Sequence, residues 1–247
     1  MPLDTSTYSL ALLRLDGRRW NELRRIHAQI STQAAADGSS YLEMGNTKVI
    51  CTVTGPAEGR RTAQGAGQEC RVEVEISVAG FSGVERKRRG RADKRTQEMQ
   101  HTLTTAFSSI LFTHLYPHST IILTLHVLSQ DGSLLAACLN AATLALIDAG
   151  IPMSDYLCAC TAGSTANEDT DEPLLDLNGL EEQELPFLTA GVLGDSDKVA
   201  VLMLETRVRV ERVEGMLAVA VDGCKRVRGI LDAVVRAHGR RMVEEGV

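Results

Sequence analysis

The hydrophobic residues of this chain recur with two different periods, and the period switches along the sequence. Residues 47–54 (TKVICTVT) and 70–79 (CRVEVEISVA) alternate apolar and polar side chains, as half-buried β-strands do. Residues 96–116 instead repeat their apolar positions at helical spacing until Pro117 stops the pattern. Residues 120–128 alternate again. Strands and helices must therefore share one fold, because neither period alone covers the chain.

The second half of the chain continues the mixed pattern. A helix rich in small residues is predicted for 134–149, where a glycine ends it. Strand-like stretches follow at 156–162, 187–194 and 199–205, and a long closing helix is predicted from about 211 to 242. Blocks of strands that alternate with helices predict an α+β or α/β fold with two sheets.

The opening third of the chain is expected to form an antiparallel sheet. Residues 31–46, around Asp37-Gly38-Ser39, are predicted to be a hairpin turn between an earlier strand and the strand at 47–54. The length of 247 residues suits one large domain or two closely packed halves.

The composition is that of a soluble globular protein, with 44% hydrophobic and 23% charged residues. No apolar run reaches the roughly 18 residues that a membrane-spanning helix needs, and the N-terminus has no basic region followed by an apolar stretch. We therefore expect an intracellular protein without a membrane partner. The six cysteines show no CxxC spacing and no nearby histidine cluster, so buried core thiols are expected, with no metal and no cofactor.

Charge is distributed unevenly along the sequence, although the net charge is only −6. Seven basic residues crowd the segment 86–95, whereas no Lys or Arg occurs from Thr96 to Asp197. Acidic residues concentrate between 168 and 184. One short segment of the chain is therefore suited to polyanions, and the middle of the chain is not.

Five short motifs occur in order along most of the sequence. They are Leu15-Asp16-Gly17-Arg18-Arg19, Asp37-Gly38-Ser39, Gly45-Asn46-Thr47-Lys48-Val49, Gly55-Pro56 and residues 145–153 (ALIDAGIPM). Over about residues 14–240 this set resembles the RNase PH family, and within it the eukaryotic exosome subunit that corresponds to the active-site subunit of the archaeal exosome. The resemblance implies one domain over residues 1–247 with the RNase PH fold: two βαβα-like halves of S5-like topology, assembled in a six-membered ring. An alternative interpretation of Asp16-Gly17-Arg18 is a turn with a surface arginine.

The resemblance also locates a phosphate site, because family enzymes degrade RNA from its 3′ end with inorganic phosphate as the nucleophile. It places the phosphate loop at residues 131–136 (DGSLLA), at the N-terminus of a helix, where backbone N–H groups and the helix dipole favour an anion. Active relatives carry Ser or Thr followed by Arg where this chain has Leu134 and Leu135. Losing one preorganised donor costs roughly a hundred- to a thousandfold in rate, so an inactive, degenerate site is expected.

A pair of acids completes the site in active relatives, where two aspartates lie six residues apart. By resemblance they fall on Asp176 and Glu182 in this chain. The longer Glu side chain would displace its carboxylate and disturb the geometry of a metal. Two interpretations stay open: vestigial site residues, or a solvated acidic loop.

Four basic residues are the predicted contacts for RNA. Arg60 and Arg61 follow Gly55-Pro56 in a loop rich in Gly and Ala, where the resemblance implies residues that project into a central pore. Lys94 and Arg95 precede the helix at 96–116, and Arg95 matches a family arginine that contacts phosphate or RNA. Aromatic residues make up only 4% of the chain, which argues against base-stacking modules and for contacts with the uniform phosphate backbone.

The hypothesis that combines these features is a non-catalytic ring subunit of the RNA exosome. It would scaffold the complex and line the channel that guides single-stranded RNA to associated 3′–5′ exoribonucleases. Its expected partners are other RNase PH-like subunits, S1/KH-type cap subunits, the exoribonucleases and RNA, in the nucleus, nucleolus and cytoplasm. The alternatives are an active phosphate-dependent 3′–5′ exoribonuclease, and an S5-like ribosomal protein or small-molecule kinase, for which a glycine-rich phosphate loop is missing.

Overall fold

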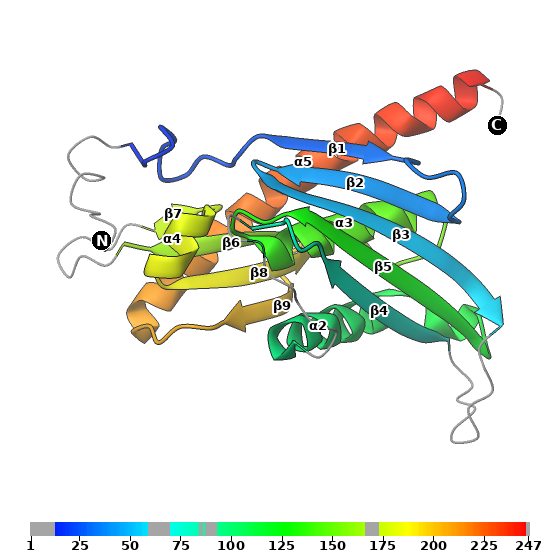
Figure 1. The fold of residues 1–247 in the computed structure, drawn as a ribbon, viewed down its shortest axis with the longest axis horizontal. Coiled ribbons are helices and arrows are strands. Elements are labelled where there is room, and N and C mark those ends of the chain that lie inside the picture. Colours follow the sequence, from blue (N-terminus) through cyan, green and yellow to red (C-terminus); the bar gives the residue numbers. More distant parts are fainter. Residues whose placement is uncertain (1–12, 59–69, 84–85, 87–92, 166–172, 246–247) are drawn as a thin grey trace.

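Two β-sheets with helices packed on them form the computed structural model (Figure 1). The structure describes residues 13–58, 70–83, 86, 93–165 and 173–245. The mixed fold that the two hydrophobic periods predict is confirmed. No helix in this described part of the chain is both long and apolar enough to span a bilayer.

The first sheet has five strands in the order β1-β2-β3-β5-β4. Its strands are β1 (Ile26–Ile30), β2 (Gly38–Met44), β3 (Thr47–Glu58), β4 (Arg71–Val78) and β5 (Ser119–Ser129). The pairs β1–β2, β2–β3 and β3–β5 are antiparallel, as expected for the opening third of the chain. Strand β4 pairs with β5 in parallel, because helix α2 (Lys94–Ile110) crosses over between them.

Strand β2 corrects the prediction that residues 31–46 are one hairpin turn. The chain turns before Gly38, forms β2, and turns again at Gly45 to enter β3. The apolar–polar alternation is hidden because Ser39 and Ser40 are fully buried. Their polar groups are satisfied inside the protein: the Ser40 hydroxyl donates to the carbonyl of Ala141 over 2.7 Å, and the Ser39 backbone N–H donates to Asp148 over 2.8 Å.

Helix α2 ends earlier than its sequence pattern predicts. The helical spacing runs to residue 116, but the helix stops at Ile110 because Leu111 adopts an extended conformation and forms a β-bridge with Met153. A short 3₁₀ turn (Thr113–Leu115) then leads into β5. The long-range bridge therefore overrides the local helical pattern before Pro117 is reached.

The second sheet has four strands in the order β7-β6-β8-β9, each antiparallel to its neighbours. Its strands are β6 (Leu157–Ser164), β7 (Pro173–Leu175), β8 (Phe187–Leu193) and β9 (Val199–Leu204). Helix α4 (Gly179–Glu184) follows β7, and helix α5 (Val210–Glu245) follows β9. The sequence predicts β6, β8, β9 and α5 correctly, but β7 and α4 lie in the acidic stretch and were not predicted.

Helix α3 (Leu134–Asp148) lies between the two sheets and contacts β2, β3 and β6. Every residue from Leu134 to Leu146 is buried, so the helix is apolar on all sides rather than amphipathic. Two of its buried polar side chains bond to the second sheet. The Asn140 amide exchanges two hydrogen bonds with the backbone of Ala159, at 2.9 and 2.8 Å, and the Thr143 hydroxyl donates to the carbonyl of Leu157 over 2.8 Å. The small side chains on α3 let both sheets pack closely against this one helix. The main hydrophobic core therefore contains residues of α3 and of both sheets.

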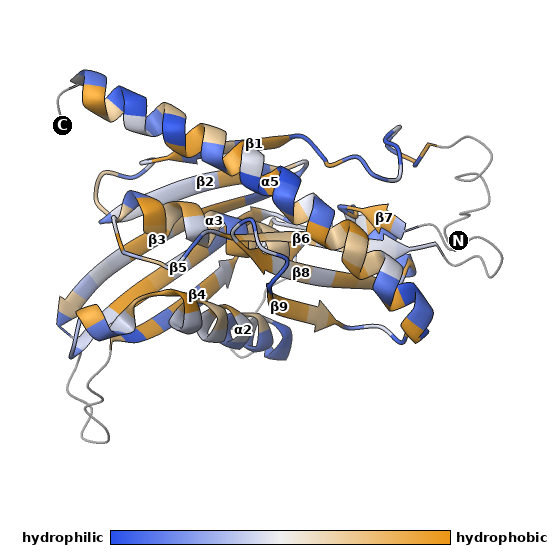
Figure 2. Cartoon of the chain, turned by 180° about the vertical axis from the view of Figure 1, so that it is seen from behind, coloured by the Kyte–Doolittle hydropathy of each residue, from blue (hydrophilic) through white to orange (hydrophobic). Residues whose placement is uncertain are grey.

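Helix α5 covers the second sheet and extends along the molecule past β1 (Figures 1 and 2). Its buried side chains lie three or four residues apart, which places them on one face. They are Met216, Ala220, Cys224, Val227 and Leu231. All six cysteines of the chain are free and buried, as the sequence predicts.

A buried ion pair between Arg24 and Asp176 ties the start of the chain to the second sheet. The Arg24 Nη2 and backbone N–H donate to the Asp176 carboxylate over 2.8 and 2.9 Å, and its Nη1 donates to the carbonyl of Asp131. Ser133, from the same loop as Asp131, also reaches the ion pair, since its hydroxyl lies 3.1 Å from Asp176 Oδ1. Burial alone would raise the pKa of Asp176, but the charge and hydrogen bonds of Arg24 outweigh it and hold that pKa below its ordinary value.

A second buried pair, Arg14 with Glu181, fixes helix α4. The Arg14 Nε donates to Glu181 over 2.9 Å, and its Nη1 donates to the carbonyl of Leu175 over 2.6 Å. Arg18 contributes a hydrogen bond of 3.0 Å to the carbonyl of Asp176, and its side chain is only 13% exposed. The interpretation of Arg18 as a surface arginine is therefore wrong, as is a solvated loop for Asp176, which is fully buried.

We expect Asp176→Ala to destabilise the fold by about 3–5 kcal/mol, because it leaves the Arg24 guanidinium buried without its partner. Urea unfolding of the full-length chain would measure this change. Asp197→Ala is the matched control, since it breaks an ion pair of 2.8 Å with Lys225 in which the Asp side chain is 80% exposed. The control should change stability by no more than about 0.5 kcal/mol. Equal effects of the two substitutions would contradict the structural role of Asp176.

Candidate functional site

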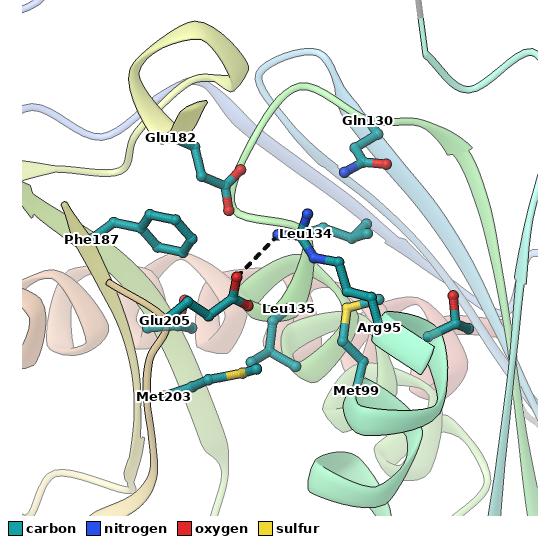
Figure 3. A pocket seen from close by; sticks show the side chains of 11 residues that line it. Arg95, Met99, Gln130, Leu134, Leu135, Glu182, Phe187, Met203 and Glu205 are labelled. Carbon is teal, nitrogen blue, oxygen red and sulfur yellow. Dashed lines mark hydrogen bonds and ion pairs between the residues drawn. The ribbon is translucent and has the colours of Figure 1, made fainter. Parts of the chain in front are cut away.

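A pocket lies where the N-termini of α2 and α3 meet α4 and the second sheet (Figure 3). Its lining residues are Arg95, Thr96, Met99, Gln130, Leu134, Leu135, Glu182, Phe187, Thr189, Met203 and Glu205. Four residues singled out in the sequence thus come together here: Arg95, Leu134, Leu135 and Glu182. They come from three helices that are far apart in the sequence.

One wall of the pocket is apolar. Leu134 and Leu135 occupy the first turn of α3 and are only 5% and 6% exposed. Met99 and Phe187 are also buried and line the same space. None of these side chains can donate a hydrogen bond, so at this wall only backbone N–H groups could bind an oxyanion.

The charged residues of the pocket carry a net negative charge. Among its lining residues, Arg95 is the one cation, and Glu182 and Glu205 are two carboxylates. Arg95 pairs with Glu205 over 3.4 Å, and their side chains are 55% and 36% exposed. Such an exposed pair is weak and is screened by salt. The Arg95 guanidinium is therefore already paired with a carboxylate of the chain itself.

Glu182 points into the pocket from α4 (Figure 3). Its half-buried position raises the pKa of its carboxyl, and the charge of Glu205 raises it further. Arg95 and the backbone of Ser133 lower the pKa, but they do not outweigh burial, and the result is a pKa above the ordinary value. The negative charge of Glu182 is therefore only partly balanced by nearby positive groups, and an additional anion in the pocket would be repelled by it.

Asp176 does not line the pocket, although the sequence pairs it with Glu182. Its oxygens accept hydrogen bonds from Arg24 and Ser133 and are fully buried. Asp176 therefore belongs to the buried ion pair with Arg24, whereas Glu182 lines the pocket. Within the described residues, no group of three or more His, Cys, Asp or Glu side chains is placed to hold a metal ion.

The predicted RNA contacts divide into two groups. Lys94 and Arg95 are exposed at the N-terminus of α2, and Arg95 also reaches the pocket. Arg60 and Arg61 lie outside the described residues. Sequence reasoning missed Glu205, since nothing in the sequence connects the end of β9 with α2. It also missed Arg24, whose only signal is its position shortly after the Asp16-Gly17-Arg18 motif.

Comparison with known proteins identifies the family. The two models described as "3′ exoribonuclease family", domain 1 and domain 2, match residues 22–152 and 155–223. "Exosome complex component ski6" of Schizosaccharomyces pombe is 42% identical over 232 residues, which cover 94% of each chain. "Exosome complex component RRP41" of Homo sapiens is 42% identical over 229 residues, which cover 92% of each chain.

Solved structures agree with the sequence relatives. Rice (Oryza sativa) Rrp46 superposes with a TM-score of 0.80 at 26% identity, over 90% of this chain and 100% of that chain. A chain of the Archaeoglobus fulgidus exosome with RNA bound to the active site gives a TM-score of 0.74 at 19% identity, over 91% and 95% of the two chains, which shows a common fold. The RNase PH fold is thus confirmed, as a mixed α+β structure with two sheets. The chain belongs to the 3′ exoribonuclease family, the family of RNase PH.

Proposed function

We propose that this chain is a ring subunit of an RNA exosome that scaffolds the complex and does not itself cleave RNA. The observation that carries the proposal is the pocket at the N-terminus of α3, which presents two leucines and a net negative charge where phosphate would have to bind. In this proposal the chain guides single-stranded RNA to associated 3′–5′ exoribonucleases in RNA processing and decay.

The alignment of this chain with exosome components, over nearly their whole length, supports the proposal that it is a ring subunit. The relatives named exosome complex components align over more than nine-tenths of this chain and of their own length. In this proposal, the aligned part of the chain carries the surfaces from which a ring of similar subunits is built. We therefore propose other RNase PH-like subunits as ring neighbours, with S1/KH-type cap subunits and exoribonucleases as further partners, in the nucleus, nucleolus and cytoplasm.

The chemistry of the pocket supports the absence of catalysis. A phosphorolytic site must hold phosphate beside the scissile phosphodiester, so it needs several cationic or hydrogen-bonding groups. Here Leu134 and Leu135 supply none, and Arg95 pairs with Glu205. Active relatives have two side-chain donors for phosphate at the positions of Leu134 and Leu135. Each charge-assisted hydrogen bond that is lost there removes about 1.5–3 kcal/mol of binding free energy.

We expect a ring reconstituted around this chain, without associated hydrolytic nucleases, to release no nucleoside diphosphates from RNA when phosphate is added. The missing donors and the two pocket carboxylates should prevent phosphate from attacking. Chromatography of the products would measure the release, with an active RNase PH enzyme as positive control. Phosphate-dependent release that disappears with Arg95→Ala or Glu182→Ala in this chain would overturn the non-catalytic assignment.

We also propose that Arg60 and Arg61 contact RNA in the channel. Charge reversal of both residues to Glu should weaken RNA binding by the assembled complex, because cations that track the phosphate backbone release counterions. If each arginine neutralises one phosphate, the slope of log K against log salt should fall by about 1.4 for single-stranded RNA.

Arg240 and Arg241 offer the matched control, because they are a second pair of adjacent arginines, exposed near the end of α5. Reversal of this pair to Glu should leave the salt slope unchanged, and both double variants should assemble normally by native mass measurement. If the two double variants bind RNA equally well, the channel role of Arg60 and Arg61 is wrong.

A further inference from the structure

We propose that the aromatic turn, residues 112–118, stacks on the bases of single-stranded RNA. This inference deepens the proposed function and rests on it, because it adds base contacts to the phosphate contacts proposed for Arg60 and Arg61. The ligand is single-stranded RNA of any sequence, since every base has a π-face on which an aromatic ring can stack.

Aromatic side chains are rare in this chain but gather in the aromatic turn. Phe, Trp and Tyr make up 4% of all residues, and the chain has six histidines. Within the aromatic turn every second side chain is an aromatic ring: Phe112, His114, Tyr116 and His118. The turn contains no Asp, Glu, Lys or Arg. It therefore offers ring faces without a carboxylate that would repel RNA.

The rings at the start of the aromatic turn are exposed and lie against each other. The Phe112 side chain is 41% exposed, and His114 is also exposed. Their ring centroids are 5.9 Å apart and their planes are inclined by 62°, which is an edge-to-face pair. In this geometry the edge of one ring covers one face of the other. The remaining ring faces are therefore available to a base.

The backbone of the aromatic turn is held by hydrogen bonds that leave these rings free. The Phe112 N–H donates to the carbonyl of Pro152 over 3.3 Å. The Leu115 N–H donates to the carbonyl of Phe112 over 3.1 Å, within the 3₁₀ turn. None of these bonds uses the side chain of Phe112 or His114. The rings are thus presented from an ordered backbone, which lowers the entropic cost of binding a base.

The aromatic turn lies beside both ends of segment 59–69, which carries the two arginines proposed to contact RNA. Glu58, which precedes this segment, pairs with Ser119 at the start of β5. Cys70 follows the segment, and its N–H donates to the carbonyl of Thr113 over 3.1 Å. The end of β3 and the starts of β4 and β5 therefore lie together at one end of the first sheet (Figure 1). RNA whose phosphates are bound by the two arginines would pass the aromatic turn with its bases.

The test compares RNA binding by the assembled ring that contains either the wild-type chain or the double variant Phe112→Leu with His114→Ala. Leucine keeps apolar bulk and removes the ring. Fluorescence anisotropy with a labelled single-stranded RNA should show binding that is weaker by about fivefold or more. The slope of log K against log salt should stay unchanged, because stacking neutralises no phosphate. The difference between the two rings should vanish for an oligonucleotide of the same length that lacks bases.

The matched control removes one aromatic ring and one histidine elsewhere, by Trp20→Leu with His101→Ala. The Trp20 side chain is 44% exposed, and its carbonyl accepts a hydrogen bond from Leu175 of the second sheet. His101 is exposed on α2. This control should bind RNA as the wild-type ring does, and so should Phe112→Tyr, which keeps the ring. His114→Ala alone should show a smaller loss in the same direction, so that the result does not depend on the folding of one variant.

Three results would overturn the inference. The first is equal RNA affinity of the double variant and the wild-type ring. The second is a loss of affinity that persists on the oligonucleotide without bases. The third is loss of the ring in native mass measurements while circular dichroism shows a folded variant chain, which would mean that the aromatic turn contacts a protein neighbour instead. The proposed RNA channel fails by a different observation, namely that the wild-type ring binds no single-stranded RNA.

Discussion

The buried ion pair between Arg24 and Asp176 joins segments that are far apart in the sequence. Arg24 precedes the first sheet, Asp176 follows β7 of the second sheet, and Ser133 and Asp131 belong to the loop that begins α3. Arg24, Ser133 and Asp176 are buried, so removal of one partner leaves the others unsatisfied. The shape of the pocket depends on the Arg24–Asp176 ion pair, because the ion pair holds together the loop before α3 and the segment before α4, and both helices line the pocket.

The same ion pair explains why Asp176 and Glu182, two acids six residues apart in the sequence, have different surroundings in the structure. Asp176 stays ionised because Arg24 compensates its burial, and its pKa falls. Glu182 lies one helical turn beyond the Asn178 cap, shares Arg95 with Glu205, and has a raised pKa. One carboxylate therefore stabilises the fold, and the other sets the charge of the pocket. The proposed scaffold role rests on this combination of a negatively charged pocket and an apolar wall.

The sequence predicts those parts of the fold that show a clear hydrophobic period. Strands β4 and β5 and helix α3 are predicted to within a residue at each end, whereas β3 continues four residues beyond its predicted end and α5 is longer than predicted at both ends. Strand β2 was missed because Ser39 and Ser40 are buried polar residues, and their hydrogen bonds to α3 do not show in a pattern of hydropathy. Helix α4 was missed because Glu181 is buried by an ion pair with a residue 167 positions away. The resemblance placed Leu134, Leu135 and Glu182 in one site, but only the structure adds Glu205 and separates Asp176 from the pocket.

A density map of the assembled ring, obtained with bound RNA in a buffer that contains phosphate, tests the central claim most directly. The account predicts that this chain occupies one position of a six-membered ring, with Glu182 lining the pocket and no phosphate beside Leu134 and Leu135. Density for a phosphate held by the first backbone N–H groups of α3 and by Arg95, next to the 3′ end of the RNA, would contradict it.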